Sequence, residues 1–152
     1  MGEPGGVGPE IALAAWRVLK SQGPVFFLIA DPALFSREAV QEIAHPEEAA
    51  AIFPSALPLL PLETPVAARK GEASPENAPA VIESIEHAVA LSLAGAAAGV
   101  VTNPIQKSSL IAAGFKFPGH TEFLADLTSK ALMPDGRARG PVMMLAGPEL
   151  KT

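Results

Sequence analysis

The sequence predicts an α/β layer structure with a largely parallel sheet. Short apolar runs, of the kind found in strands buried on both faces, alternate with longer segments whose apolar residues recur at helical spacing. Hydrophobic residues make up 49% of the chain and charged residues 18%, a balance typical of a globular protein. The 152 residues are enough for one compact domain with its own core, and they contain no internal repeat.

The first half of the chain predicts two helices and two strands. Pro9 suits the first turn of a helix whose apolar face continues to Leu19. Residues 25–30 form a continuous apolar run that predicts a buried strand, and residues 33–44 suggest a second helix. Prolines interrupt regular structure after that, so residues 57–62 are expected to form no more than an edge strand.

The second half alternates helices and strands more regularly. Ser74 and Pro75 are typical of a helix N-cap and first turn, and the helix that they open is expected to end at Gly95. The remaining elements are expected in this order: a strand at 99–102, helices at 107–113 and 122–130, and a strand at 142–146.

Composition argues against several classes of function. The formal net charge is −5 and the 11 lysines and arginines form no cluster, so nothing predicts nucleic-acid binding. No uncharged apolar run reaches the roughly eighteen residues that would predict a membrane span. The chain has no cysteine, which excludes disulfides, thiolate zinc sites and a cysteine nucleophile, and is compatible with a cytoplasmic protein.

The histidines do not have the spacing of a metal site. His45 lies in a proline-flanked acidic segment and His87 on the helix expected from residue 75, and both are interpreted as surface or half-buried helix residues. No pair of histidines matches a zinc motif, and no Gly-x-Ser-x-Gly elbow is present. The residues therefore predict neither a metal site nor a serine hydrolase.

The glycine-rich segment at residues 2–10 reads Gly-Glu-Pro-Gly-Gly-Val-Gly-Pro-Glu. Two interpretations fit it: a loop whose backbone comes close to a ligand, or a purely structural turn, which a lone Gly-rich segment favours. It does not match the dinucleotide fingerprint, because no third glycine follows Gly8 at the required spacing. It does not match a P-loop either, because it lacks the Gly-Lys-Ser/Thr ending.

Polar residues follow the strand expected at 99–102. In open α/β sheets, ligands bind beyond the carboxyl ends of the strands. Asn103 could donate a hydrogen bond there, and Lys107 could meet an anionic group. The alternative is that Asn103 belongs to a turn before Pro104 and that Lys107 is a solvated residue at a helix start.

Residues 117–123, Phe-Pro-Gly-His-Thr-Glu-Phe, place an imidazole and a hydroxyl directly before an expected helix. Histidine is well suited to proton transfer near neutral pH, and a helix start favours anions. His120 and Thr121 could therefore hold a phosphorylated or carboxylated substrate. The alternative is that Thr121 only caps the helix and that His120 is a solvated turn residue.

Four motifs occur in order along essentially the whole chain. They are the glycine-rich segment at 2–10, Val-Thr-Asn-Pro-Ile-Gln-Lys at 101–107, the Phe-Pro-Gly-His-Thr-Glu-Phe segment and Val-Met-Met-Leu-Ala at 142–146. Together they resemble the N-terminal half of the 4-hydroxythreonine-4-phosphate dehydrogenases of pyridoxal 5′-phosphate biosynthesis. The resemblance implies the α/β/α layers of the isocitrate and isopropylmalate dehydrogenase fold.

The resemblance also implies a chemistry. Members of the family oxidise the secondary alcohol of 4-phosphooxy-L-threonine with NAD or NADP, and loss of CO₂ then gives 3-amino-2-oxopropyl phosphate. A divalent metal (zinc, magnesium or cobalt) polarises the alcohol. Matched residue by residue, His120 and Thr121 are the substrate-contacting pair, and Lys107 and Asn103 support substrate binding. The resemblance further implies a homodimer, and it assigns no catalytic, cofactor-binding or metal-ligating residue to this chain.

Members of the family are longer than this chain, and their metal-binding histidines and most dinucleotide contacts follow the Met-Met-Leu-Ala strand. We therefore expect residues 1–152 to be an incomplete N-terminal portion of such a dehydrogenase, without its first strand and its C-terminal half. Two alternatives stay open. The chain is a non-catalytic fragment that binds substrate or forms a dimer, or its parent is a paralogue that oxidises another phosphorylated hydroxy acid.

Overall fold

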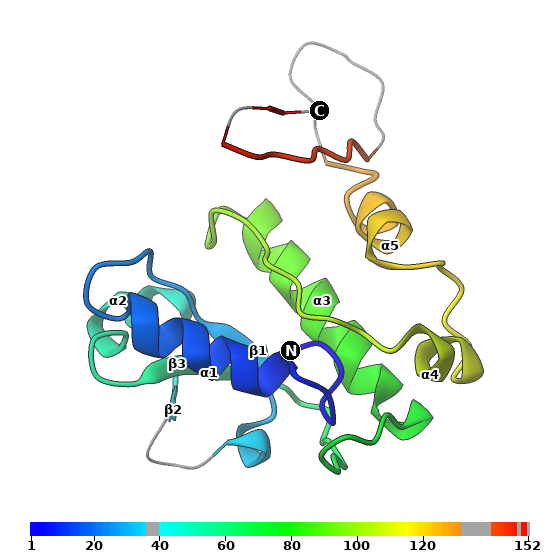
Figure 1. Cartoon of the computed structure of the whole chain (residues 1–152), viewed down its shortest axis with the longest axis horizontal. Helices are drawn as coiled ribbons and strands as arrows, with labels where there is room; N and C mark the ends of the chain where they lie inside the picture. Colours follow the sequence, from blue (N-terminus) through cyan, green and yellow to red (C-terminus); the bar gives the residue numbers. More distant parts are fainter. Residues whose placement is uncertain (36–39, 132–140, 149, 152) are drawn as a thin grey trace. The chain divides into compact units, whose positions relative to one another are not determined.

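The computed structural model describes residues 1–35, 40–131, 141–148 and 150–151 (Figure 1). The chain divides into two compact units, Met1–Lys116 and Phe117–Thr152, and each is described here by itself. The first unit contains the sheet. No helix in the described ranges is long and apolar enough to cross a membrane.

A parallel three-stranded sheet forms the centre of the first unit. Its strands are β1 (Leu28–Ala30), β2 (Val40–Glu42) and β3 (Leu57–Pro61), in the order β1-β3-β2. Ile29 pairs with Leu60 on one side of β3, and Val40 pairs with Leu57 on the other. The prediction of parallel strands is confirmed, although β1 begins three residues later than the apolar run that predicted it.

β3 is the middle strand, so the prediction of an edge strand at 57–62 was wrong. The N–H of Ile43 donates to the carbonyl oxygen of Leu59 (2.9 Å). The backbone N–H and C=O groups of odd-numbered residues of β3 therefore point toward β2, and those of even-numbered residues point toward β1. β1 begins opposite Leu59 and β2 ends opposite it. The nitrogen of Pro58 therefore faces β1 before that strand starts, and that of Pro61 faces β2 after it ends. Neither proline removes a hydrogen bond from the sheet.

One face of the sheet packs against helix α1 (Gly8–Leu19). The indole Nε1 of Trp16 donates to the carbonyl oxygen of Phe53 (2.8 Å), which satisfies the one polar atom of a buried aromatic side chain. The buried residues of this cluster are Ala12, Trp16, Leu28, Ala30, Phe53, Leu57 and Leu59. The helix predicted from Pro9 to Leu19 is thus confirmed.

The other face packs against α3 (Ala78–Leu93), together with the short helix α2 (Ala49–Ile52). This cluster contains Ile29, Ile43, Ala49 and Leu60, with Ala88 and Leu91 of α3 packed against it. Because successive residues of a strand point to opposite faces, Ile29 lies in this cluster while its neighbours in β1 lie in the other. The predicted α/β/α layering is confirmed.

The start of α3 follows the sequence signals. A 3₁₀ turn, η3 (Pro75–Asn77), precedes the helix, and the Oγ of Ser74 accepts the N–H of Glu76 (3.3 Å). Val81, Ile85 and Val89 of its predicted apolar face are buried. The predicted cap at Ser74 and the helix itself are confirmed, with the helix ending at Leu93 rather than Gly95.

The helix predicted at 33–44 is not present in its described part. A 3₁₀ turn, η1 (Pro32–Leu34), follows β1, and β2 occupies residues 40–42, whereas residues 36–39 lie outside the described range. Asp31 explains the first break, because its Oδ1 accepts the N–H of Ala33 (2.8 Å) and its Oδ2 that of Val66 (2.9 Å). Pairing with β3 then outweighs the helical spacing. A further turn, η2 (Pro46–Glu48), leads into α2.

The strands predicted at 99–102 and 142–146 are not formed. Both segments run without regular secondary structure, apart from one isolated bridge between Ala146 and Lys151. The side chain of Val101 is 96% exposed and that of Val142 is 92% exposed. An apolar run becomes a strand only when a neighbouring strand takes its N–H and C=O groups, and neither segment is paired with a described strand of the sheet.

Two helices complete the described structure. α4 (Lys107–Ala112) confirms the helix predicted at 107–113. α5 (His120–Leu127) corresponds to the helix predicted at 122–130; it begins two residues earlier and ends three residues earlier than predicted.

Candidate functional site

Three segments of the first unit surround a cavity of about 250 Å³. The glycine-rich loop forms one wall, Gly71 and Ala73 on either side of residue 72 form a second, and residues 104–106 form a third. The lining residues are Glu3, Gly5, Gly6, Val7, Gly71, Ala73, Pro104, Ile105 and Gln106. Two motifs that lie about a hundred residues apart in the sequence are thus brought together.

Asn103 fastens the glycine-rich loop to the third segment. Its side-chain Nδ2 donates to the carbonyl oxygens of Met1 (3.0 Å) and Gly8 (3.3 Å). Next to it, the N–H of Glu3 donates to the carbonyl oxygen of Pro104 (2.9 Å). In this structure the amide N–H₂ of Asn103 therefore holds the backbone around the cavity.

The glycines permit backbone segments to touch. The N–H of Gly71 donates to the carbonyl oxygen of Gly5 (2.7 Å), and a Cβ at Gly5 would lie 2.0 Å from the carbonyl oxygen of Glu72. Gly2 has a φ of 83°, and a Cβ there would lie 2.7 Å from the carbonyl oxygen of Pro104. The structural interpretation of the loop is correct at these two positions, and the same loop lines the cavity.

Glu3 is the residue that sequence reasoning missed. Its side chain is only 7% exposed, and its Oε1 is buried without a hydrogen-bond partner among the described residues. Burial raises the pKa of this carboxyl, and the backbone N–H groups of Gly5 and Ser74, which lower it, offset only part of that effect. The signal in the sequence was an acidic residue inside a Gly-Pro-rich loop, where a carboxylate has little room to reach solvent.

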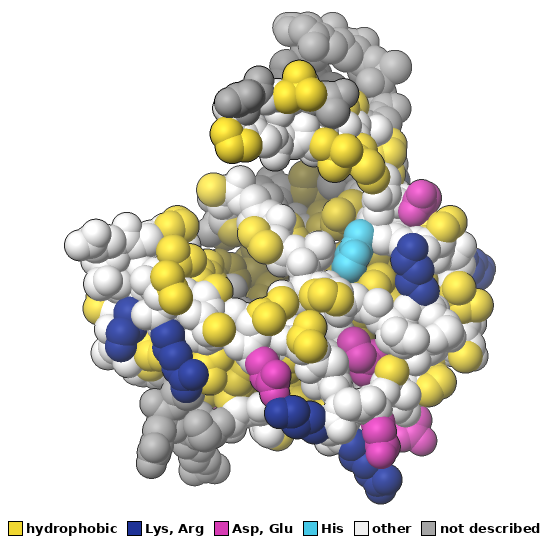
Figure 2. Space-filling model, in the orientation of Figure 1, with side chains coloured by type: hydrophobic (Ala, Val, Ile, Leu, Met, Phe, Trp, Pro, Cys, Tyr) yellow, Lys and Arg dark blue, Asp and Glu magenta, His cyan; other side chains and the backbone are white. Residues whose placement is uncertain are grey.

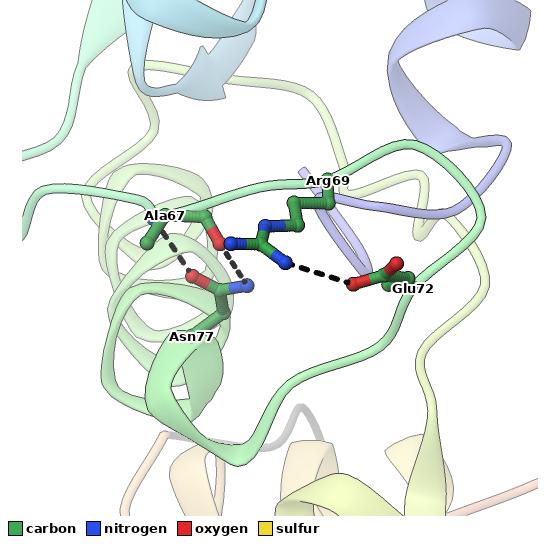
Figure 3. A network of polar contacts seen from close by, with 4 residues as sticks. All are labelled: Ala67, Arg69, Glu72 and Asn77. Carbon is green, nitrogen blue, oxygen red and sulfur yellow. Dashed lines mark hydrogen bonds and ion pairs between the residues drawn. The ribbon is translucent and has the colours of Figure 1, made fainter.

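The second wall is anchored to the start of α3. Asn77 is buried; its Oδ1 accepts the N–H of Ala67 (3.0 Å) and its Nδ2 donates to the carbonyl oxygen of Ala67 (3.3 Å). Figure 3 shows this pair of bonds, with Arg69 and Glu72 reaching toward each other across the loop at 3.9 Å. The exposed ion pair between Arg69 and Glu72 contributes little, so Asn77 holds this loop more firmly than that pair does.

Opposite charges lie side by side on this part of the surface. Lys70 pairs with Glu10, and the hydrogen bond to that carboxylate raises the pKa of the lysine. Figure 2 shows the same mixture over the face in view, where Lys and Arg side chains lie next to Asp and Glu side chains rather than in one continuous basic patch.

Lys107 is the first residue of α4, and its side chain is exposed. It does not line the cavity, although Pro104, Ile105 and Gln106 just before it do. The segment was expected to follow a strand at the edge of the sheet, but its actual neighbour is the glycine-rich loop.

His120 and Thr121 are the first two residues of α5, in the second unit, and both are half-buried. Gly119 is the N-cap, in extended conformation, and no side chain caps the helix, so the alternative in which Thr121 is the cap was wrong. The rings of Phe117 and Phe123 lie 5.1 Å apart and pack the Pro-Gly turn against the helix. This contact resembles a hydrophobic staple and sets the angle at which the chain enters α5.

The structure thus brings Asn103 to the cavity in the first unit and holds His120 and Thr121 in one helical turn of the second. No three His, Cys, Asp or Glu side chains gather so as to hold a metal ion in the part of the chain that is described. We therefore assign no metal ligand among the described residues.

Comparison with known proteins gives consistent results. A family model described as "Pyridoxal phosphate biosynthetic protein PdxA" matches residues 22–152. A 4-hydroxythreonine-4-phosphate dehydrogenase of Caulobacter vibrioides is 49% identical over 99% of this chain. The chain belongs to the PdxA family.

Solved structures agree with this assignment. The 4-hydroxythreonine-4-phosphate dehydrogenase of Klebsiella pneumoniae matches 85% of the chain with a TM-score of 0.69 and 33% identity. The matched region is 43% of the Klebsiella protein. A putative 4-hydroxythreonine-4-phosphate dehydrogenase of Salmonella typhimurium matches 99% of the chain with a TM-score of 0.76 and 28% identity, over 48% of its own length. The chain spans about half the length of its PdxA relatives, such as 46% of the Caulobacter protein.

Proposed function

We propose that the protein carrying this chain is an NAD- or NADP-dependent dehydrogenase that oxidises and decarboxylates 4-phosphooxy-L-threonine in pyridoxal 5′-phosphate biosynthesis. The product is 3-amino-2-oxopropyl phosphate. The observation that supports the proposal is membership of the PdxA family, with a relative of that name 49% identical over 99% of the chain.

The role proposed for this chain is substrate binding. His120 and Thr121 occupy the first turn of α5, where the positive end of the helix dipole favours an anion such as a phosphate. In that position the imidazole and the hydroxyl contact the substrate. Asn103 and Lys107 support binding, Asn103 by holding the loop around the cavity and Lys107 by its positive charge.

The reaction also needs a hydride acceptor and a divalent metal (zinc, magnesium or cobalt), which supplies charge to polarise the alcohol. The described residues contain no group of three His, Cys, Asp or Glu side chains that could hold the metal, so the role proposed for this chain is limited to binding the substrate. Assembly as a homodimer is proposed from the family resemblance, and light scattering on the purified protein tests it.

The deciding experiment is an assay of NADH formation from 4-phosphooxy-L-threonine with added divalent metal. Substrate-dependent NADH formation supports the proposal, and its absence in the full-length protein contradicts it. His120→Ala is expected to lower kcat/KM by about tenfold or more, which is the loss expected when one charge-assisted hydrogen bond is removed. The circular dichroism spectrum should stay the same. The control is His87→Ala on α3, in the other unit, for which we expect unchanged kinetics.

The absence of three clustered metal ligands from the described residues favours a second candidate function. In this alternative, residues 1–152 by themselves bind substrate without turning it over. Calorimetric binding of 4-phosphooxy-L-threonine, with no NADH formed under the same conditions, distinguishes it from the dehydrogenase.

A further inference from the structure

The charged groups that line the cavity have one sign. Its lining contains a carboxyl group, that of Glu3, and no lysine, arginine or histidine. One carboxyl oxygen of Glu3 has no hydrogen-bond partner among the described residues, although the side chain is buried. A buried carboxylate oxygen without a donor is costly, because it has lost water and gained nothing in exchange.

The missing partner is therefore a hydrogen-bond donor, and a positively charged donor would compensate most of the cost. A metal ion fits poorly, because no described group of three His, Cys, Asp or Glu side chains could hold one. A primary ammonium group satisfies a carboxylate with a single contact, and it can spend its other N–H groups on backbone carbonyls or water.

The size of the cavity limits the ligand. A volume of about 250 Å³ is smaller than the roughly 300–1,000 Å³ of pockets that hold drug-sized ligands. This suits a small amino compound, or the amino end of a somewhat larger one.

We propose that this cavity binds the primary ammonium group of a small ligand, with the carboxylate of Glu3 as its acceptor. The proposal goes beyond the function proposed above and rests on it only for the choice of probe. Oε1 is buried in the absence of ligand, so the carboxyl group must turn toward the cavity. The turn gives up the hydrogen bonds that the carboxyl group accepts from the backbone N–H groups of Gly5 and Ser74, and the bonds to the ammonium group must replace them.

The walls are already in place for such a ligand. Hydrogen bonds fasten the glycine-rich loop to Pro104 and to Gly71, and the amide of Asn103 adds two more. Little ordering entropy would then be lost on binding, which is the advantage of a preformed site. Several lining residues are glycine or alanine, so backbone groups can meet the ligand directly.

The test measures binding to the purified full chain by calorimetry, with 4-phosphooxy-L-threonine and with the same compound lacking its amino group. We expect the Kd of the deamino compound for wild-type protein to be at least about tenfold higher than that of the amino compound, because it lacks one charge-assisted hydrogen bond. In Glu3→Gln the two compounds are expected to bind alike. Glu72→Gln serves as the matched control, because Glu72 lies beside the same loop without lining the cavity.

Equal binding of the two compounds to wild-type protein would overturn the inference, whether or not Glu3→Gln folds. So would an unchanged preference in a folded Glu3→Gln protein. If neither compound binds wild-type protein, the proposed substrate is wrong, and titration with ethanolamine then tests the cavity by itself. A chemical-shift change of the Gly5 and Gly71 amides that is absent from Glu3→Gln supports the inference, and no change overturns it.

The dependence of affinity on pH provides a further readout. Burial raises the pKa of Glu3, and only the ionised carboxylate attracts an ammonium group. Affinity for the amino compound should therefore fall as the pH is lowered through that raised pKa, and the decrease should be absent from Glu3→Gln. A wild-type affinity that falls no more than that of the variant would contradict the proposal.

Discussion

β3 and residues 99–102 are both short apolar segments, but only β3 forms a strand. Leu59 of β3 is completely buried between two parallel strands, whereas the side chain of Val101 is 96% exposed. The apolar residues are similar; the difference is the presence of pairing strands and of helices on both faces. Hydrophobicity makes a strand possible, and neighbours make it form.

Leu59→Ala is expected to have the largest effect on stability. Removing a buried branched side chain from the middle strand should lower the free energy of unfolding by about 2–5 kcal/mol. Val101→Ala should change it by less than about 0.5 kcal/mol, because the side chain contacts mainly solvent. Urea unfolding followed by circular dichroism measures both. Similar losses in the two variants would show that residues 99–102 are packed in solution and would remove the contrast.

Gly5→Ala and Gly99→Ala extend the comparison to the backbone. A Cβ at Gly5 would lie 2.0 Å from the carbonyl oxygen of Glu72, whereas nothing lies within 4 Å of a Cβ at Gly99. We expect Gly5→Ala to cost about 1–3 kcal/mol of unfolding free energy, because the two loops must move apart, and Gly99→Ala to be nearly neutral. Thermal unfolding of the two variants side by side checks this, and a neutral Gly5→Ala would mean that the walls of the cavity are not held together as described.

The smallest expected effect concerns Glu83 of α3, whose carboxylate accepts the N–H groups of Glu63 (2.8 Å) and Thr64 (3.0 Å) just after β3. Burial alone would raise the pKa of Glu83, but these hydrogen bonds, that of the Thr64 side chain and the charge of His87 together lower it. A lowered pKa stabilises the folded state above the ordinary value of 4.5, and this stabilisation is lost as the pH falls through the folded-state pKa.

Glu83→Gln should therefore unfold with less dependence on pH between about 3 and 5 than wild-type protein. The difference should be below about 1 kcal/mol, because Glu83 is only half-buried and solvent screens its charge. Denaturant unfolding at several pH values measures it, with Glu86→Gln on the same helix as the control. If the two variants show the same pH dependence, Glu83 does not fasten this loop to α3.

Sequence reasoning succeeded where the information was local. The cap at Ser74, the helix after Pro9 and the short helix from Lys107 all follow from neighbouring residues, and all are present. It failed where the outcome depended on distant partners. The prolines of β3 suggested an edge strand, and only the stagger of β1 and β2 shows why a central strand tolerates them.

The candidate site divides in the same way. The order of motifs was enough to identify the family, and the comparisons confirm it. The roles of His120, Thr121, Lys107 and Asn103 in substrate binding stay predictions. No pattern in the sequence indicated that Asn103 donates to the backbone of the glycine-rich loop. The burial of Glu3 was missed, although its place inside a Gly-Pro-rich loop was a signal for it.

By itself the sequence determined the fold class, the helix boundaries set by caps and prolines, and the family. Each depends on the character or order of residues along the chain. The tertiary structure decided which apolar runs become strands and which polar residues share a cavity. Pairing and burial depend on groups far apart in the sequence, and the free energy of a buried carboxylate such as that of Glu3 depends on the atoms that surround it in space.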